Sequence, residues 1–169
     1  MARVRSFRDL RVYQELKRLH LEVHNQSLTF PRFELYELGS QIRRASNSAP
    51  AQLAEGHGSR HTNIYIEAIS RSQGEIQETR HHLDMAHEKR YLSDARFRDL
   101  DGRYEACARM LERLHQSLSQ WHGSTRTPDR VEEESPGYGT DVLPSWEIAA
   151  QITDEIDAES APKPSEDPA

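Results

Sequence analysis

The chain has 169 residues, of which 35% are hydrophobic and 30% charged, with a formal net charge of −6. This length predicts one domain with its own core plus an additional segment, and no apolar run approaches the roughly 20 residues that cross a bilayer, which excludes a membrane-spanning helix. The charge is uneven: residues 1–122 hold 19 Lys and Arg against 16 Asp and Glu (+3), whereas residues 123–169 hold 3 against 12 (−9).

Cysteine content and the first residues indicate the compartment. Cys107 is the only cysteine, which excludes an intrachain disulfide and suits a reducing environment. The first residues, Met1-Ala2-Arg3-Val4-Arg5, are not followed by the apolar stretch of a signal peptide. We therefore expect a cytoplasmic protein.

Apolar residues at helical spacing predict two helices in the first third of the chain. The first covers about residues 7–26, with Leu10, Tyr13, Leu16, Leu19 and Val23 on one face. Pro31 separates it from a second helix, which begins near Phe33 and ends at Gly56-His57-Gly58. Pro50 is expected to bend this second helix without ending it.

Two further helices complete the predicted domain. The third begins at Thr62 and ends near Arg90, with Ile69, Ile76 and Leu83 a heptad apart. The fourth, over about residues 94–121, starts at a Ser93 or Asp94 cap and carries a continuous apolar seam from Phe97 to Trp121. Because the connections are short, successive helices are antiparallel. The predicted fold is all-α, an antiparallel up-down four-helix bundle over residues 1–122.

Residues 123–169 have a different composition. They hold six of the eight prolines and the acidic excess, which is typical of a largely disordered tail. Within them, Ser145 begins an amphipathic stretch, a candidate short helix over about residues 145–157, that carries Trp146, Ala149, Ile152 and Ile156. Two interpretations stay open: a solubilising tail, or a peptide that docks on a partner or on this protein's own basic face.

Several stretches, in order along the chain, resemble one protein family. They are "FRDLRVYQ", "QIRRASNSAPAQLAEG", "IYIEAI", "GEIQETRHHLDMA" and the following "YL". Over about residues 7–121 the chain resembles the bacterial four-helix bundle proteins encoded in intervening sequences of 23S ribosomal RNA genes, which implies a bundle that assembles as a homopentamer. A more distant similarity, to the accessory protein of diversity-generating retroelements, implies a basic surface for nucleic acid and a reverse transcriptase as partner.

The stretch over residues 41–56 has physical consequences of its own. Its small residues allow another helix to approach closely. We therefore expect its main role to be helix packing, and we rank ligand binding second and catalysis last. Glu55 lies at the negative end of its helix and needs a cation, for which Arg43 or Arg44 of the same or a neighbouring subunit is the candidate. Gly74, in the third helix, is tolerable if a neighbour packs onto its backbone. The structural motif thus comprises Arg43, Arg44, Ala54, Glu55, Gly56 and Gly74.

The spacing of charges separates paired from available cations. An acid stands four residues before each of Arg71, Arg98, Arg103 and Arg109, which favours ion pairs within the helix. Arg11 has only the weaker, reversed pairing with Glu15. Without strong aromatic clustering, contacts to phosphate or to folded shape are expected. The predicted nucleic-acid-binding residues are Arg8, Arg11, Lys17, Arg18, Arg43 and Arg44.

Potential metal and catalytic groups are sparse. The pairs Glu78/His81 and Glu112/His115 lie beside the apolar seams, and His20/His24 and His57/His61 come without a third ligand. Cys107 occupies a seam position, as a core residue does. We expect no metal, no cofactor and no enzymatic activity.

Two functions follow from these features. The leading hypothesis is a non-enzymatic homo-oligomer, pentameric by resemblance, that binds structured RNA or DNA, or a nucleic-acid-processing protein, through a basic surface. The alternative is a structural or interaction module whose acidic tail recruits a protein partner without contacting nucleic acid.

Overall fold

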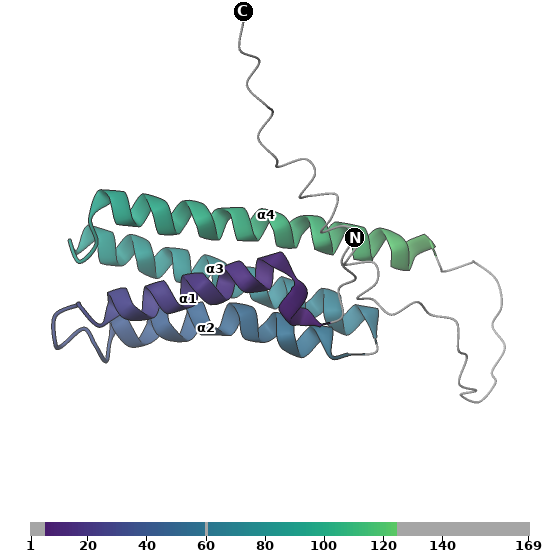
Figure 1. Ribbon diagram of the computed structural model, residues 1–169, viewed down its shortest axis with the longest axis horizontal. Coiled ribbons are helices and arrows are strands. Elements are labelled where there is room, and N and C mark those ends of the chain that lie inside the picture. Colours follow the sequence, from purple (N-terminus) through teal and green to yellow (C-terminus); the bar gives the residue numbers. More distant parts are fainter. Residues whose placement is uncertain (1–5, 60, 125–169) are drawn as a thin grey trace, which may run out of the picture.

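The computed structural model describes residues 6–59 and 61–124, and regular structure in these ranges is entirely helical. A short 3-10 helix, η1 (Phe7–Asp9), precedes α1 (Arg11–Ser27), α2 (Leu38–His57), α3 (Thr62–Glu88) and α4 (Asp94–Ser124). The α1–α2 and α3–α4 connections lie at one end of the bundle and the α2–α3 connection at the other (Figure 1). The predicted all-α, up-down four-helix bundle is confirmed. The predicted acidic tail and its short helix lie outside the described residues.

Helix boundaries differ from the predictions at two starts. The first α-helix begins at Arg11, because Leu10 adopts an extended conformation and buries its side chain between η1 and α1. A capping box between Ser6 and Asp9 stabilises η1. The second helix begins at Leu38, five residues later than predicted, since residues 32–37 form turns around the buried Glu34. None of the described helices combines the length and apolar character needed to cross a membrane.

Glu34 ties the two connections at one end of the bundle together. Its carboxylate accepts hydrogen bonds from Lys89 Nζ at 2.6 Å and from the Tyr91 hydroxyl at 3.2 Å, both in the α3–α4 connection. The Leu38 backbone N–H also donates to it, at the start of α2. These donors, Lys89 foremost, lower the pKa of Glu34. The carboxylate is thereby buried without being left unpaired.

Helices α2 and α3 approach each other closely. A Cβ added at Gly56 would collide with the Ala68 side chain and lie 3.1 Å from Tyr65 Cδ2. Farther along the same interface, the Ser72 hydroxyl donates to the Ala49 carbonyl at 2.8 Å. Small residues in α2 therefore do permit close packing, as predicted.

Gly74 has a different environment from the one predicted. A Cβ added there would meet no atom within 4 Å, and the residue is exposed on the outer side of α3. The expectation that a neighbouring helix packs onto its backbone is wrong for the described chain. Ser72 and Ile76, two residues before and after it, are buried, so Gly74 lies on the opposite, solvent-exposed side of the helix.

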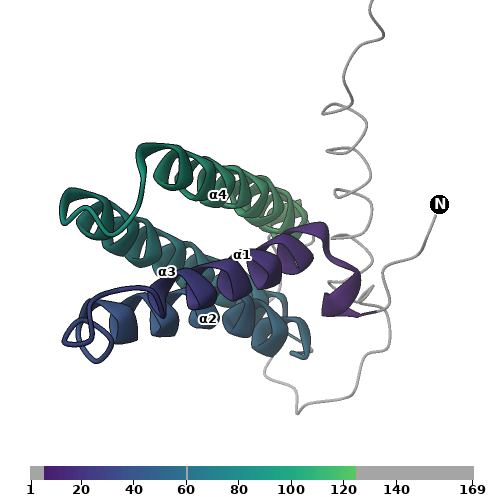
Figure 2. The same ribbon diagram turned by 60° about the vertical axis from the view of Figure 1, so that its left-hand side comes forward.

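The helices form two layers, α1 with α2 and α3 with α4 (Figure 2). One hydrophobic core fills the space between them. Each of the four α-helices contributes fully buried side chains, among them Leu16, Ile42, Ile69 and Leu111. Cys107 belongs to this core, and burial raises the pKa of its thiol to about 12. A thiol so protonated at neutral pH is a packing group, as the seam position predicted.

We expect Gly56→Ala and Gly74→Ala to have opposite effects on stability. At Gly56 the added methyl collides with α3, which should lower the free energy of unfolding by about 1–3 kcal/mol. At Gly74 the same methyl meets only solvent and should raise it by about 0.5–1 kcal/mol through improved helix propensity. Urea denaturation followed by circular dichroism measures both. Equal effects at the two positions would contradict the close α2–α3 contact.

Candidate functional site

Long charged side chains join α1 to α4. Glu22 of α1 accepts hydrogen bonds from Arg96 Nη2 at 2.9 Å and from Arg103 Nη1 and Nη2 at 3.1 and 2.9 Å. Arg103 also contacts Glu15, one heptad before Glu22, with its Nε donating at 2.9 Å. The predicted in-helix pair of Arg103 with Asp99 is present at 3.6 Å and is the longest of these contacts. Arg103 therefore serves mainly as a bridge between helices, a role that spacing within α4 did not indicate.

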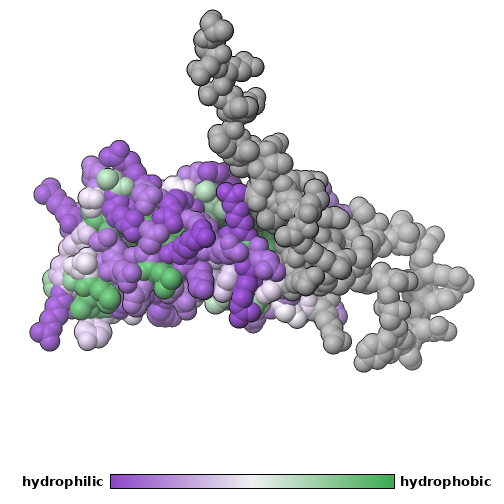
Figure 3. Space-filling view, in the orientation of Figure 1, coloured by the Kyte–Doolittle hydropathy of each residue, from purple (hydrophilic) through white to green (hydrophobic). Residues whose placement is uncertain are grey.

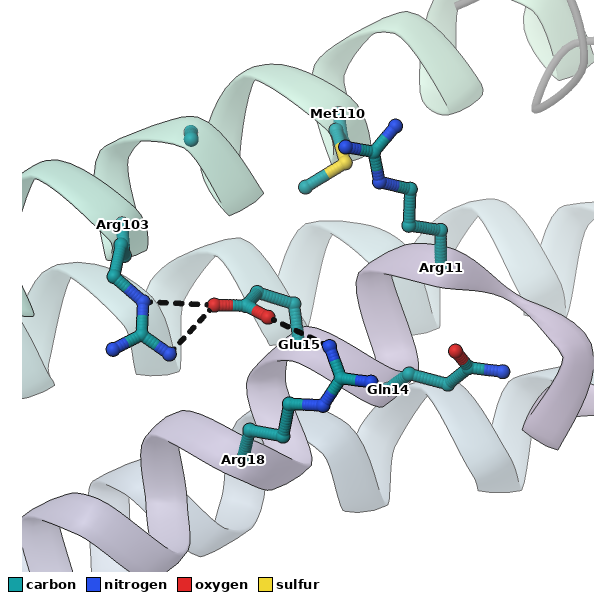
Figure 4. Close-up of a pocket in the computed structure, with 7 residues that line it drawn as sticks. Arg11, Gln14, Glu15, Arg18, Arg103 and Met110 are labelled. Carbon is teal, nitrogen blue, oxygen red and sulfur yellow. Dashed lines mark hydrogen bonds and ion pairs between the residues drawn. The ribbon is translucent and has the colours of Figure 1, made fainter. Parts of the chain in front are cut away.

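A groove lies between α1 and α4 beside these ion pairs, with a volume of about 330 Å³. Its lining residues are Arg11, Gln14, Glu15, Arg18, Arg103, Ala106 and Met110. Figure 4 shows Glu15 between Arg103 and Arg18, with Arg11 extending toward Met110 on the opposite helix. Arg103 is held by Glu15 and Glu22, and Arg11 and Arg18 of α1 place two further positive charges in the lining of the groove.

The predicted cations of α1 lie on its outer surface. Arg11, Lys17 and Arg18 are all exposed. Arg18 makes one long contact, 3.5 Å to Glu15, and 68% of its side chain remains exposed. Lys17 makes no hydrogen bond or ion pair with the described residues. We call these three residues the α1 cationic face. Arg8 is exposed just before α1, in η1, where its guanidinium stacks on the Phe7 ring at 4.6 Å.

Arg43 has a structural task. Its Nη2 donates to the Leu35 carbonyl at 2.7 Å and its Nη1 to the Ser27 hydroxyl at 2.9 Å. These bonds anchor the α1–α2 connection to the first turns of α2. A guanidinium used in this way has few donors left for an external phosphate, so Arg43 is not expected to bind nucleic acid.

Arg44 lies on another side of the bundle. It is exposed on α2 and its charge acts on Glu75 of α3, where it opposes the increase in the carboxyl pKa caused chiefly by burial. The expected pairing of Glu55 with Arg43 or Arg44 of the same chain is absent from the described residues. Glu55 follows Arg44 by eleven residues, about 16 Å along the helix, which is too far for an ion pair.

The other four-residue charge pairs were predicted correctly. Arg71 contacts Glu67 at 2.7 Å, Arg109 contacts Glu105 at 2.7 Å, and Arg98 contacts Asp94 at 3.8 Å. These three arginines are partly neutralised by their neighbours within the helix. Lys17, in contrast, has no ion pair with the described residues. The three arginines therefore serve as controls for substitutions on the α1 cationic face.

Two histidines, His20 and His57, contact neighbouring helices in the described part of the chain. His20 Nδ1 is 3.0 Å from the Ser46 hydroxyl, and burial followed by the charge of His24 lowers the pKa of His20. The half-buried His57 ring packs between Phe7 and Tyr65, with centroids 6.3 and 5.8 Å away. Of the two Glu-x-x-His pairs, the glutamates are exposed, as predicted from their positions beside the seams.

One group of potential ligands was not singled out from the sequence. Asp84, His87 and Glu88, in the last turns of α3, bring their ligand atoms within 4.8 Å of one another. The His87 ring stacks on Phe97 at 4.6 Å, and its Nε2 lies 2.9 Å from Asp94 Oδ1. This histidine thus already has a role, which is to fix the α3–α4 turn.

Comparison with known families identifies the chain. The model of the 23S rRNA-intervening sequence protein family matches residues 8–113, well over half of the chain. The match spans most of η1, all of α1, α2 and α3, and most of α4. Comparison with curated proteins gives no match. The chain belongs to the 23S rRNA-intervening sequence protein family.

We expect Glu22→Gln to lower the free energy of unfolding by about 1 kcal/mol, because it weakens hydrogen bonds from two arginines. Bonds from Arg103 lower the pKa of Glu22, so the stabilisation is present above the ordinary glutamate pKa and is lost as pH falls through the lowered value. The difference between wild type and variant should therefore shrink in acid, as measured by urea denaturation across pH.

Glu67→Gln is the matched control, since it removes one exposed in-helix pair and should cost about 0.3–0.5 kcal/mol. Equal losses in the two variants, or a pH-independent loss for Glu22→Gln, would contradict the bridging role of Glu22.

Proposed function

We propose that this family member acts without catalysis, by binding structured nucleic acid through the α1 cationic face. The observation that carries the proposal is the position of Arg11, Lys17 and Arg18 on the exposed side of one helix, beside a groove with two of them at its edge. Phosphate backbones are attracted to such clustered cations, and the attraction needs no reading of base sequence.

The chemistry of this surface favours backbone contacts. Gln14 adds an amide to the groove, with its Nε2 donating to the Arg8 carbonyl at 2.9 Å, and the remaining lining atoms come from Ala106, Met110 and charged residues. No aromatic ring lines the groove for base stacking. A folded or double-stranded nucleic acid, which presents its phosphates at a fixed spacing, fits this surface better than a single strand does.

Assembly into a homo-oligomer, with a pentamer as the expected form, belongs to the same proposal. Large apolar side chains are exposed around the α1–α2 connection: Leu28 by 55%, Phe33 by 69% and Tyr36 by 83%. Figure 3 shows hydrophobic residues at this end of an otherwise hydrophilic face. Exposed apolar clusters of this kind support contact with another chain, and a ring of copies would repeat the α1 cationic face around its circumference.

A second candidate function is recruitment of a protein partner, which the acidic tail supports. Residues 123–169 carry a net charge of −9, which suits a basic partner such as a nucleic-acid-processing enzyme. A cytoplasmic location suits both functions. The two are distinguished by whether the purified protein binds nucleic acid by itself.

The test compares two triple variants of the full chain. Arg11→Ala/Lys17→Ala/Arg18→Ala should weaken binding to a fluorescent RNA hairpin and reduce the salt slope by about one unit per lost phosphate contact. Arg71→Ala/Arg98→Ala/Arg109→Ala removes the same charge from α3 and α4, outside the α1 cationic face, and should weaken binding much less. Fluorescence anisotropy over a range of salt concentrations measures both.

Equal weakening by the two variants would mean that only net charge matters. If neither the wild-type chain nor its variant with a neutralised tail, Asp154→Asn/Glu155→Gln/Asp157→Asn, binds RNA or DNA at low salt, the proposed function is wrong and protein recruitment is favoured.

A further inference from the structure

The lining of the α1–α4 groove combines two apolar residues with three arginines, two of which contact the Glu15 carboxylate that also lines it. Ala106 and Met110 of α4 form the floor, and Met110 packs against the hydrophobic core with part of its side chain still accessible. Arg11 and Arg18 of α1 stand at the edge (Figure 4). This combination suits a ligand with one apolar face and several negative charges, which is more than a phosphate backbone offers.

The chain itself contains a segment of matching chemistry. Residues 145–157, "SWEIAAQITDEID", place Trp146, Ala149, Ile152 and Ile156 at helical spacing. The same residues include Glu147, Asp154, Glu155 and Asp157, and neither Lys nor Arg. An amphipathic acidic peptide of this type binds grooves by inserting its apolar side chains while its acids meet cations at the edge.

The groove is within reach of this segment. Met110 lies fourteen residues before Ser124, the last residue of α4, or about 21 Å along the helix. Residues 125–144 supply twenty residues of linker, which can extend to about 66 Å, so the segment can reach the groove. Tethering raises the local concentration of the segment above that of a separate peptide.

We propose that residues 145–157 dock in the α1–α4 groove. Trp146 covers the floor formed by Ala106 and Met110, and the acids of the segment meet Arg11 and Arg18. The tail is favoured over a second copy of the bundle as occupant because the charges are complementary. The segment carries four acids, whereas a second α1 would bring its own cations against Arg11 and Arg18.

Docking also implies regulation, and this consequence rests on the proposed function. The tail and a nucleic acid would compete for the same two arginines, so the tail would act as an internal inhibitor of nucleic-acid binding. The docking itself requires no nucleic acid and is tested without one.

The experiment uses the full chain and the fluorescence of Trp146. Trp121 and Trp146 are the only tryptophans, so Trp121→Phe leaves Trp146 as the single reporter. If the segment is docked, emission is shifted to shorter wavelength than in denaturant and acrylamide quenches it poorly. Raising NaCl from about 0.05 M to about 0.5 M should move both toward the values of the unfolded chain, since ion pairs at the edge are screened.

Charge reversal locates the contact. In the Trp121→Phe background, Arg11→Glu/Arg18→Glu should red-shift the emission of Trp146 fully, whereas the control Arg44→Glu/Arg98→Glu, with the same change of charge at exposed positions elsewhere, should leave it unchanged. Circular dichroism verifies that each variant folds. Asp154→Asn/Glu155→Gln/Asp157→Asn, which neutralises the acids of the segment itself, should red-shift the emission of Trp146 in the same way.

The outcomes separate the two proposals. Emission typical of an exposed indole in the folded chain, or equal shifts in both arginine variants, would overturn the docking whatever the protein binds. If Arg11→Glu/Arg18→Glu instead lowers the oligomer mass in light scattering and leaves Trp146 emission unchanged, the groove is an interface between copies and the docking is wrong. If the neutralised tail releases Trp146 without raising RNA affinity, docking holds and its inhibitory consequence fails.

Discussion

The close contact between α2 and α3 sets the geometry of this bundle. Gly56 has no side chain where Ala68 and Tyr65 lie against it, and the Ser72 hydroxyl reaches the Ala49 carbonyl of the neighbouring helix directly. A side chain at Gly56 would force the two helices apart. The two layers of the bundle are therefore drawn together on one side.

The opposite side of the bundle is built from long side chains. Between α1 and α4, long arginine and glutamate side chains bridge the two helices, whereas between α2 and α3 glycine and serine allow direct contact. A groove lies beside the arginine–glutamate contacts. The result is a bundle with one tight seam, between α2 and α3, and one open seam lined by charged side chains, between α1 and α4. The α1 cationic face borders the open seam, which is why we place the binding function there and not at the arginine pair of α2.

Much of the fold was predictable, because apolar periodicity and helix-breaking residues depend on local sequence. The exceptions depend on distant partners. Nothing near Phe33 indicates that Glu34 will be buried by Lys89 and Tyr91, some fifty-five residues later, and this contact is what delays the start of α2 to Leu38. Likewise, Gly56 was expected only to end a helix, whereas its lack of a side chain is needed for contact with α3.

The candidate site was only partly predictable, for a related reason. Spacing within a helix correctly identified the partners of Arg71, Arg98 and Arg109, but it assigned Arg103 to Asp99 when the stronger contacts come from α1. The heptad spacing shared by Glu15 with Glu22 and by Arg96 with Arg103 was a signal available for this bridge. Arg43 and Arg44 are adjacent in sequence, yet one anchors a connection and the other faces solvent, a distinction that depends on the path of residues 28–37.

The most direct test of where this protein meets nucleic acid is mass-spectrometric footprinting of lysine and arginine side chains in the Asp154→Asn/Glu155→Gln/Asp157→Asn variant, whose neutralised tail leaves α1 uncovered, with and without a bound RNA hairpin. We predict protection of Arg11, Lys17 and Arg18, with Arg44 and Arg71 as reactive in the complex as in the free protein. Protection of Arg44 and Arg71 with α1 left reactive would place the interface on the α2–α3 side and contradict the function proposed for the open seam.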